Sequence, residues 1–141
     1  MIQDINYKAN EIFDTISLYL SKNNKYKAKL KKRELNSFYP IICFENRSNL
    51  LNSSAIDDNS LEKIRSLSFE ISILAVDNNK EQVSSIEICE YYENIIAYVM
   101  ENVYKLKGGT DAKIYNINDE KATKFVMHYY CKWYVAKNIL Y

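Results

Sequence analysis

The feature that most constrains the fold is a two-residue alternation over residues 66–76. Its apolar positions fall on one side of an extended chain: Leu67, Phe69, Ile71, Ile73 and Ala75. Serines and Glu70 occupy the other side until Leu74 and Val76 interrupt it near the end. This period is that of a β-strand with one face on a hydrophobic core, and the interruption predicts cover on both faces at the far end. Such a strand needs partner strands and a layer that covers its apolar face.

Residues 84–107 are predicted to form the main covering helix. Ser84 and Glu87 have the spacing of an N-terminal capping box, in which each side chain bonds the other residue's free backbone N–H. Lys105 and Lys107 suit the negative end of the helix dipole, and Gly108-Gly109 is expected to stop the helix in a left-handed conformation. The expected buried stripe consists of Ile88, Tyr92, Ile95, Val99, Val103 and Leu106, widened by Cys89 and Ile96.

A second amphipathic helix is predicted over residues 4–21, with Asp4 as its N-cap. Further strands are predicted over residues 25–30, 38–45, 113–117 and 123–135, the second with Pro40 near its start, where a missing N–H is tolerated. Residues 46–65 are rich in Asn, Ser and Asp and are expected to form a long exposed loop with a short helical turn at 61–64. The order predicts an α+β fold, in which the N-terminal helix and the long central helix cover a mainly antiparallel or mixed sheet of about five strands.

Composition sets the broad class of the chain. Its 141 residues, 48% of them apolar, are expected to form a single domain over residues 1–141. A formal net charge of +1 gives the whole molecule no preference for nucleic acid or membranes. Cys43, Cys89 and Cys131 lack a C-x-x-C spacing and are predicted to be reduced and buried. No export signal and no bilayer-spanning apolar run is recognisable, so we expect synthesis and folding in the cytoplasm and no membrane partner.

Few residues could carry catalysis. His128 is the single histidine and falls in a predicted strand among aromatic residues, where a packing or hydrogen-bonding role is expected. One histidine and three scattered cysteines do not suggest zinc, and no nucleotide-binding or hydrolase motif occurs. The acidic pairs Asp57-Asp58 and Asp119-Glu120 lie in predicted loops, which leaves a hydrolase built on carboxylates alone as an open alternative. We expect a protein that is not an enzyme and that holds no cofactor or metal.

One basic run interrupts the even charge balance. It contains seven basic residues with no acidic residue between them. Without these seven, the rest of the chain has a formal charge of −6. They are Lys22, Lys25, Lys27, Lys29, Lys31, Lys32 and Arg33. The alternation of Lys25, Lys27 and Lys29 with apolar residues predicts a strand with one wet, basic face. Three interpretations stay open: an edge strand guarded by lysines, a contact with the acidic surface of a neighbouring subunit, and a patch that contacts phosphates.

Two other segments are candidate contact surfaces. The strand over 123–135 carries aromatic residues on both sides, which predicts a central strand with a subunit interface at Tyr130, Lys132 and Tyr134. The thirteen tyrosines of the chain fit half-wet interfaces, and codon bias explains them equally well. The polar loop offers six residues for contact with a partner: Asn46, Arg47, Asn49, Asn52, Asp57 and Asp58.

The order of segments resembles a known family. An N-terminal helix leads to a Tyr-Pro strand at residues 38–42, and an Asn/Ser-rich loop leads to the alternating strand at 67–73. A long helix that ends in Gly and an aromatic last strand follow. This pattern resembles the tail terminator (tail-completion) proteins of long-tailed bacteriophages and of phage-tail-like bacteriocins. The likeness covers nearly the whole chain and lies in pattern and length, with no signature residues.

The resemblance implies an α+β subunit of a ring, expected to be a hexamer, that sits on the last ring of a tail tube. Such a ring stops tube growth and presents a docking surface for the neck or head connector. It implies contacts with tube and sheath proteins, no cofactor and no catalytic residues. DNA contact is expected only in the ring channel, for which the basic run from Lys25 to Arg33 is a candidate lining. The protein would reside in the bacterial host cytoplasm during assembly and then in the particle. Two alternatives remain: a small nucleic-acid-binding protein that uses Lys25–Arg33, and a neck or connector protein of the same particle.

Overall fold

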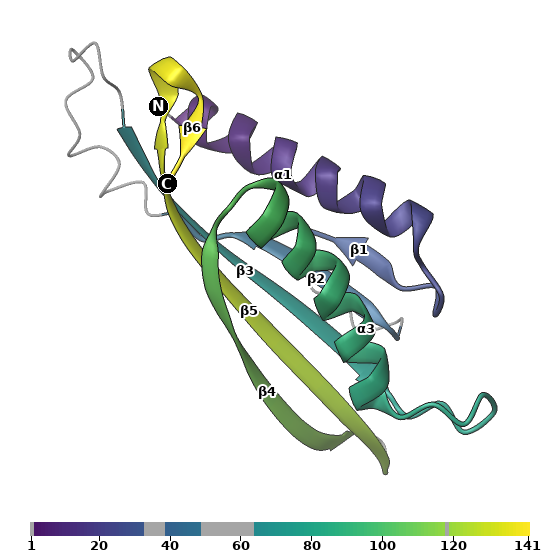
Figure 1. Cartoon of the computed structure of the whole chain (residues 1–141). Coiled ribbons are helices and arrows are strands. Elements are labelled where there is room, and N and C mark those ends of the chain that lie inside the picture. The colour runs from purple at the N-terminus through teal and green to yellow at the C-terminus, as the bar shows by residue number, and fades with distance from the viewer. Residues whose placement is uncertain (1, 33–38, 49–63, 118) are drawn as a thin grey trace.

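The computed structural model describes residues 2–32, 39–48, 64–117 and 119–141. This part of the chain has the predicted α+β architecture, with helices packed on one mixed sheet (Figure 1). The helical elements are α1 (Ile2–Lys22), α3 (Ser85–Ala97), the π-helix η1 (Tyr98–Val103) and the 3-10 helix η2 (Val135–Lys137). The strands are β1 (Lys29–Lys31), β2 (Ile41–Asn46), β3 (Ile64–Val76), β4 (Lys107–Ile117), β5 (Glu120–Tyr134) and β6 (Ile139–Leu140).

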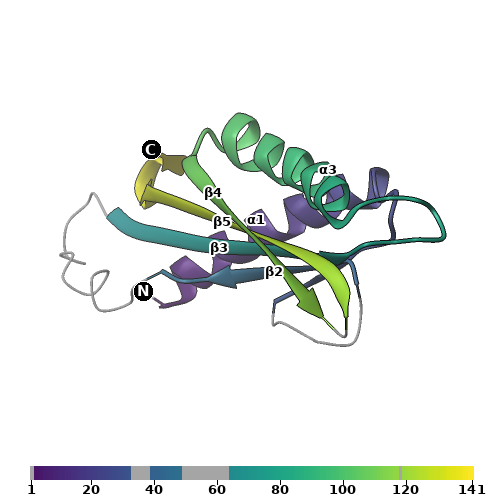
Figure 2. The same cartoon turned by 90° about the horizontal axis from the view of Figure 1, so that it is seen from below.

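The strands are arranged in the order β1-β2-β3-β5-β4, and β6 pairs with the end of β5. β1 runs parallel to β2, and the other pairs of neighbouring strands in the described sheet are antiparallel. β3 and β5 pair along almost their whole length, from Ile64 opposite Tyr134 to Val76 opposite Ala122. Both helices lie over one face of the sheet, so the described part of the chain has a helix-covered face and an open face (Figure 2).

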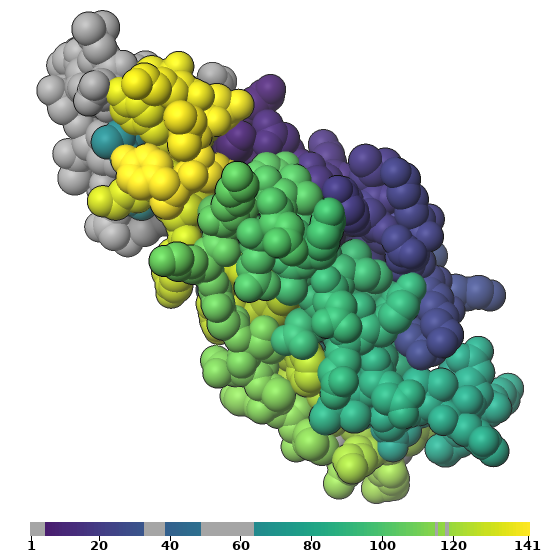
Figure 3. Space-filling model, in the orientation of Figure 1, coloured from purple at the N-terminus to yellow at the C-terminus, as the bar shows by residue number. Residues whose placement is uncertain are grey.

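The hydrophobic core lies between the helices and the covered face. The five apolar positions of the alternating strand are all buried there, and Leu74 is buried on the opposite side, as its break in the pattern predicted. α1 contributes apolar residues at three- and four-residue spacing: Ile5, Ala9, Ile12, Ile16 and Leu20. α1 and α3 lie side by side over the sheet (Figure 3), and the rings of Tyr19 and Tyr98 meet with centroids 5.7 Å apart. The periodicity of each segment therefore predicted which face it buries.

The central helix differs from its prediction in its second half. Ser84 is the N-cap as predicted, and its hydroxyl accepts the backbone N–H of Glu87 at 3.3 Å. Beyond Ala97 the backbone widens into η1, where the N–H of Tyr104 reaches the carbonyl of Val99 at 3.0 Å. A π-turn holds more residues than an α-turn, so the buried stripe shifts. Met100 is fully buried, whereas Val103, predicted to be buried, is 41% exposed.

The helix does not end at Gly108-Gly109 as predicted. Lys105 makes the turn with a left-handed φ of 58°, and Lys107 already belongs to β4. Neither glycine has a positive φ. Gly108 instead lies against β5, where a Cβ would overlap the His128 carbonyl oxygen and the Tyr129 ring, while Gly109 has open space around its Cα. The strand predicted at 113–117 consequently begins at residue 107, because the close approach lets the chain pair with β5 immediately.

The strand predicted over residues 25–30 is largely absent. Lys25 and Tyr26 lie in a turn, Lys27 has a left-handed φ of 57°, and pairing with β2 begins at Lys29. The alternation of lysines with apolar residues has the two-residue period of a strand. In the structure, however, the first half of the predicted strand is a turn held by hydrogen bonds to α3. β2 begins after Pro40, whose peptide bond to Tyr39 is cis.

Three smaller predictions are settled at the ends of elements. Asp4 is not the N-cap, because α1 begins at Ile2. The loop predicted over residues 46–65 is shorter at both ends, because Asn46 still belongs to β2 and β3 begins at Ile64. The helical turn predicted at 61–64 is therefore wrong at Ile64, and its other residues lie outside the described part of the chain. Among the described helices, none is long and apolar enough to cross a membrane.

We expect Gly108→Ala to lower the free energy of unfolding by about 1–3 kcal/mol, because the added methyl group must displace backbone and an aromatic ring. Gly109→Ala is the matched control and should change stability by less than about 0.5 kcal/mol. Urea unfolding of both variants measures the difference. Equal effects of the two substitutions would contradict the close approach of β4 to Tyr129.

Candidate interaction surfaces

The basic run lies along the α1–β1 end of the molecule. Lys22 ends α1, Lys25 and Lys27 belong to the turn, and the remaining described cations lie on or after β1. These are Lys29, Lys31 and Lys32, and of the six described lysines only Lys31 is half-buried, the others being exposed. Arg33 lies outside the described residues. The run is therefore a curved rim of separate charges and not one flat strand face.

These lysines have no carboxylate partners within the described chain. Lys32 Nζ donates to Asn10 Oδ1 at 2.8 Å and lies 4.9 Å from the Phe13 ring centroid. Lys25 Nζ lies 5.4 Å from the ring of Tyr26. Aromatic and amide contacts leave the positive charge uncompensated, so this rim can attract an anionic surface or remain solvated.

A buried tyrosine holds the turn of this rim in place. The Tyr92 hydroxyl on α3 accepts the N–H of Tyr26 at 3.0 Å and that of Ala28 at 3.2 Å. It donates to Asn24 Oδ1 at 2.6 Å, and Asn24 also bonds both backbone groups of Ala28. Burial raises the pKa of Tyr92 above its ordinary value, which keeps the hydroxyl protonated as a donor. Helical spacing placed Tyr92 in the core, but no local pattern indicates that its hydroxyl organises a turn more than sixty residues away.

The polar loop is described only at its start. Arg47 follows β2 and its guanidinium lies 2.6 Å from Glu45 and 3.0 Å from Glu70 on β3. Asn46 Oδ1 accepts the N–H and hydroxyl of Ser48, and the Ser48 hydroxyl accepts the backbone N–H of Ser68 on β3 at 3.1 Å. The other four predicted contact residues lie outside the described part of the chain: Asn49, Asn52, Asp57 and Asp58.

A row of charged groups crosses the open face from β2 to β4. After Glu45, Arg47 and Glu70, the row continues to His128 on β5 and Asp111 on β4. His128 Nδ1 is 4.0 Å from Glu70, and its Nε2 is 3.8 Å from Asp111. The His128 ring is half-exposed between these two carboxylates, at distances longer than a hydrogen bond, so its packing or hydrogen-bonding role stays a prediction. This arrangement makes the middle of the open face charged and wet.

The residues predicted for a subunit interface lie at the other end of the open face. Tyr130 is 69% exposed, Lys132 is exposed, and the Tyr134 ring is half-buried with Lys137 Nζ 5.7 Å above it. Tyr130 and Lys132 line a shallow groove with Ser66, Leu67, Cys131 and Tyr141, which we call the aromatic groove. The structure thus brings the three predicted residues onto one surface and adds the C-terminal residue to it.

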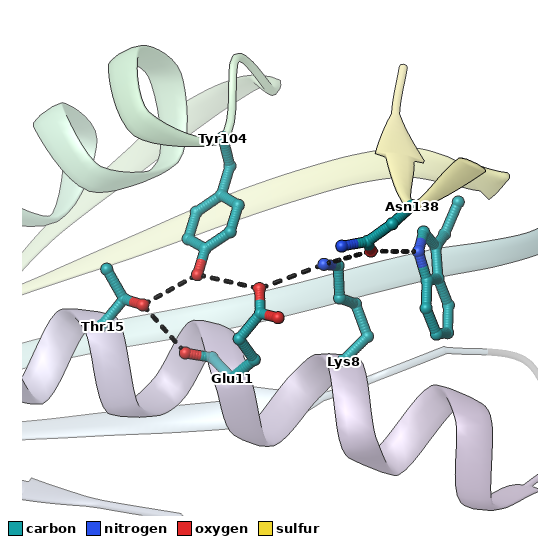
Figure 4. A network of polar contacts seen from close by, with 6 residues as sticks. Lys8, Glu11, Thr15, Tyr104 and Asn138 are labelled. Carbon is teal, nitrogen blue, oxygen red and sulfur yellow. Dashed lines mark hydrogen bonds and ion pairs between the residues drawn. The ribbon is translucent and has the colours of Figure 1, made fainter. Parts of the chain in front are cut away.

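A partly buried polar network around the Lys8 side chain fixes the C-terminal segment beside this groove (Figure 4). Lys8 Nζ on α1 donates to Glu11 at 3.0 Å and to Asn138 Oδ1 at 2.9 Å, and Trp133 Nε1 donates to the same amide oxygen at 3.0 Å. Tyr104 extends the network by contacting Glu11 at 3.3 Å and Thr15 at 2.8 Å. The sequence held one signal for this network: Lys8 falls on the apolar face of the first helix. A buried ammonium group needs hydrogen-bond acceptors, so its position indicates polar partners nearby.

The described cysteines and carboxylates do not gather into a metal site. No group of three or more His, Cys, Asp or Glu side chains among them is placed to hold a metal ion. Cys43, Cys89 and Cys131 are buried, as predicted, and no disulfide joins any two of them. Burial raises the pKa values of the Cys89 and Cys131 thiols to about 12, so neither is a thiolate near neutral pH.

We expect Tyr92→Phe to lower the free energy of unfolding by about 1–3 kcal/mol, because it removes the buried partner of the Tyr26 N–H. The same deletion of a hydroxyl at Tyr91, which accepts the Lys25 N–H in an exposed bond 3.3 Å long, should cost less than about 0.5 kcal/mol. Thermal and urea unfolding measure both. If Tyr91→Phe costs as much as Tyr92→Phe, the turn is not held by Tyr92.

The chain matches no protein-family model and no curated protein sequence. Its function must therefore be argued from the surfaces described above: the basic rim, the charged row, the aromatic groove and the exposed strand β4.

Proposed function

We propose that this chain is a structural subunit that closes into a ring, expected to be a hexamer, on the last ring of a phage or phage-like tail tube. The observation that carries the proposal is the difference between the two faces of the sheet. Two helices cover one face, whereas the other carries the charged row and the exposed Tyr130. A subunit with two unlike faces presents unlike surfaces on the two sides of a ring.

Unlike surfaces explain how such a ring ends growth. A polymerising tube exposes the same surface after every added ring, so the cap must bind that surface without recreating it. Heterologous contacts stop where complementarity stops. The opposite surface of the ring is then free to receive a neck or connector protein, and the polar segment that begins at Asn46 is proposed to contact tube or sheath.

The subunit is proposed to act without catalysis or cofactor. Its one histidine lies between two carboxylates, and no hydrogen bond joins it to a described serine, threonine or cysteine. Two of its three thiols have strongly raised pKa values. A structural role in the host cytoplasm and then in the particle requires none of these groups to react.

Deleting the gene should produce tails of uncontrolled length, or tails whose ends fray and fail to mature. Electron micrographs of the deletion strain, with and without a plasmid copy of the gene, provide the test. A neck protein gives a different result, because its loss leaves tails of normal length that do not join heads. Tails of normal length with normal ends would contradict the terminator proposal, and neighbouring genes for tube, sheath and tape-measure proteins would support it.

A second candidate is nucleic-acid binding through the basic rim. It is favoured by the described lysines of the rim, which have no described carboxylate partner. Lys25 and Lys27 also border a polar pocket with Tyr26 and Tyr39, although Glu81 lies in the same pocket. In a ring, such a rim fits DNA that passes through the channel without a tight site on each subunit.

We expect only weak binding of double-stranded DNA by the isolated chain. A site that neutralises roughly six to ten phosphates loses affinity steeply between about 50 and 200 mM salt. Gel-shift titrations at both salts compare the wild type with a fourfold Lys→Ser variant at Lys25, Lys27, Lys29 and Lys31. The matched control changes four exposed lysines elsewhere: Lys80, Lys105, Lys121 and Lys137. Sub-micromolar, salt-sensitive binding lost only in the first variant would establish a DNA site on the rim.

A further inference from the structure

The outer edge of β4 is the longest free edge of the sheet. β4 pairs with β5 over Lys107–Ile117, and among the described strands none pairs with its other edge. It is the last strand of the sheet on the side of β5, as Figure 1 shows. Side chains on both of its faces are exposed, including Ile114 at 57%. An edge of this length is a template for another strand.

The opposite edge of the sheet is protected in a way that β4 is not. β1 has only three residues, and lysines flank its single apolar side chain, Leu30. Short edges with lysines resist strand addition. β4 also carries lysines, at residues 107 and 113, but it has Asp111 between them. The partner that suits β4 must therefore meet both signs of charge.

A second copy of β4 meets this condition in one register. Two antiparallel copies overlap fully when Lys107 lies opposite the partner's Ile117. That register puts Asp111 opposite the partner's Lys113, twice, and Ala112 opposite itself. Sliding the pair by two residues in either direction brings Asp111 opposite Asp111 or Lys113 opposite Lys113. Opposite charges stabilise a cross-strand pair and like charges destabilise it, so the sequence of β4 selects the full overlap.

We propose that two copies of this chain pair through β4 in this register about a two-fold axis perpendicular to the sheet. The helices of both copies then lie on the same side of one continuous sheet. Asp111 and Lys113 face the open side, where Asp111 already lies 3.8 Å from His128. On the helix side, Ile114 packs against the partner's Thr110, which covers an exposed apolar side chain.

This pairing goes beyond the proposed ring and does not rest on it. A cyclic ring turns all its subunits the same way and contains no two-fold contact, so the dimer is the form of the chain outside the ring. It covers the edge that would otherwise invite uncontrolled strand addition. A monomeric chain would overturn the dimer and leave the terminator proposal standing, whereas normal tails in the deletion strain would do the reverse.

Cysteine cross-linking tests the register. Ala112→Cys places a thiol next to its own copy, with Cα atoms about 4.5–5.5 Å apart, within the range that a disulfide spans. Thr110→Cys is the matched control, because the same register separates its two copies by about 13 Å along the strands. Mild oxidation of the full chain, followed by non-reducing gels, should give a linked dimer for Ala112→Cys only. Equal linking of both variants, or of neither, would overturn the proposed register.

Charge reversal tests the pairing without any cross-link. Lys113→Asp sets like charges opposite each other twice and should raise the dimer dissociation constant about tenfold, as measured by analytical ultracentrifugation. Adding Asp111→Lys to the same chain exchanges the two charges and should restore dimerisation. Circular dichroism and thermal unfolding confirm that each variant is folded. A wild type that stays monomeric at high micromolar concentration, or a double variant that fails to recover, would overturn the dimer.

Discussion

The rest of the structure depends on the antiparallel pairing of β3 with β5. Both strands place their apolar residues on the face that α1 and α3 cover, and the pairing extends from Ile64 to Val76. A slip of one residue would turn the whole apolar set of one strand to the open face, so burial strongly specifies the register. The positions of β2 on one side and β4 on the other follow from this pair, and with them the free edges of the sheet.

Two polar clusters, each built on a buried side chain, then join segments that are far apart in the sequence. Tyr92 ties the turn after α1 to α3, and Lys8 ties α1 to the segment after β5. Hydroxyl and ammonium groups in a core must keep hydrogen-bond partners, which makes these contacts specific as well as stabilising. As a result, the turn of the basic rim and the C-terminal end of the aromatic groove are held in fixed positions on the core.

The candidate surfaces lie on different elements and can be altered separately. The basic rim belongs to the α1–β1 connection, the charged row to the open face, the aromatic groove to β5 and the C-terminus, and the free edge to β4. Asp111 is the one residue shared by two of them, since it ends the charged row and lies on the free edge. A partner on either face of the sheet and a partner on the free edge of β4 can therefore bind at the same time, except where both would contact Asp111.

The sequence alone determined the fold class, the face that each long element buries and the start of α3, because these depend on local periodicity and capping. The segments around Ser84 and over residues 66–76 were predicted correctly for this reason. Only the tertiary structure decided the turn at Lys25–Lys27, the π-helix that exposes Val103 and the place of Gly108 in β4. Each of these depends on a partner distant in sequence or on packing: the Tyr92 hydroxyl, the burial of Met100 and the Tyr129 ring. Long-range contacts override local conformational preference where a buried polar group needs a hydrogen-bond partner, or where a neighbouring side chain leaves no room for a Cβ. A local sequence pattern does not contain the identity of that distant residue.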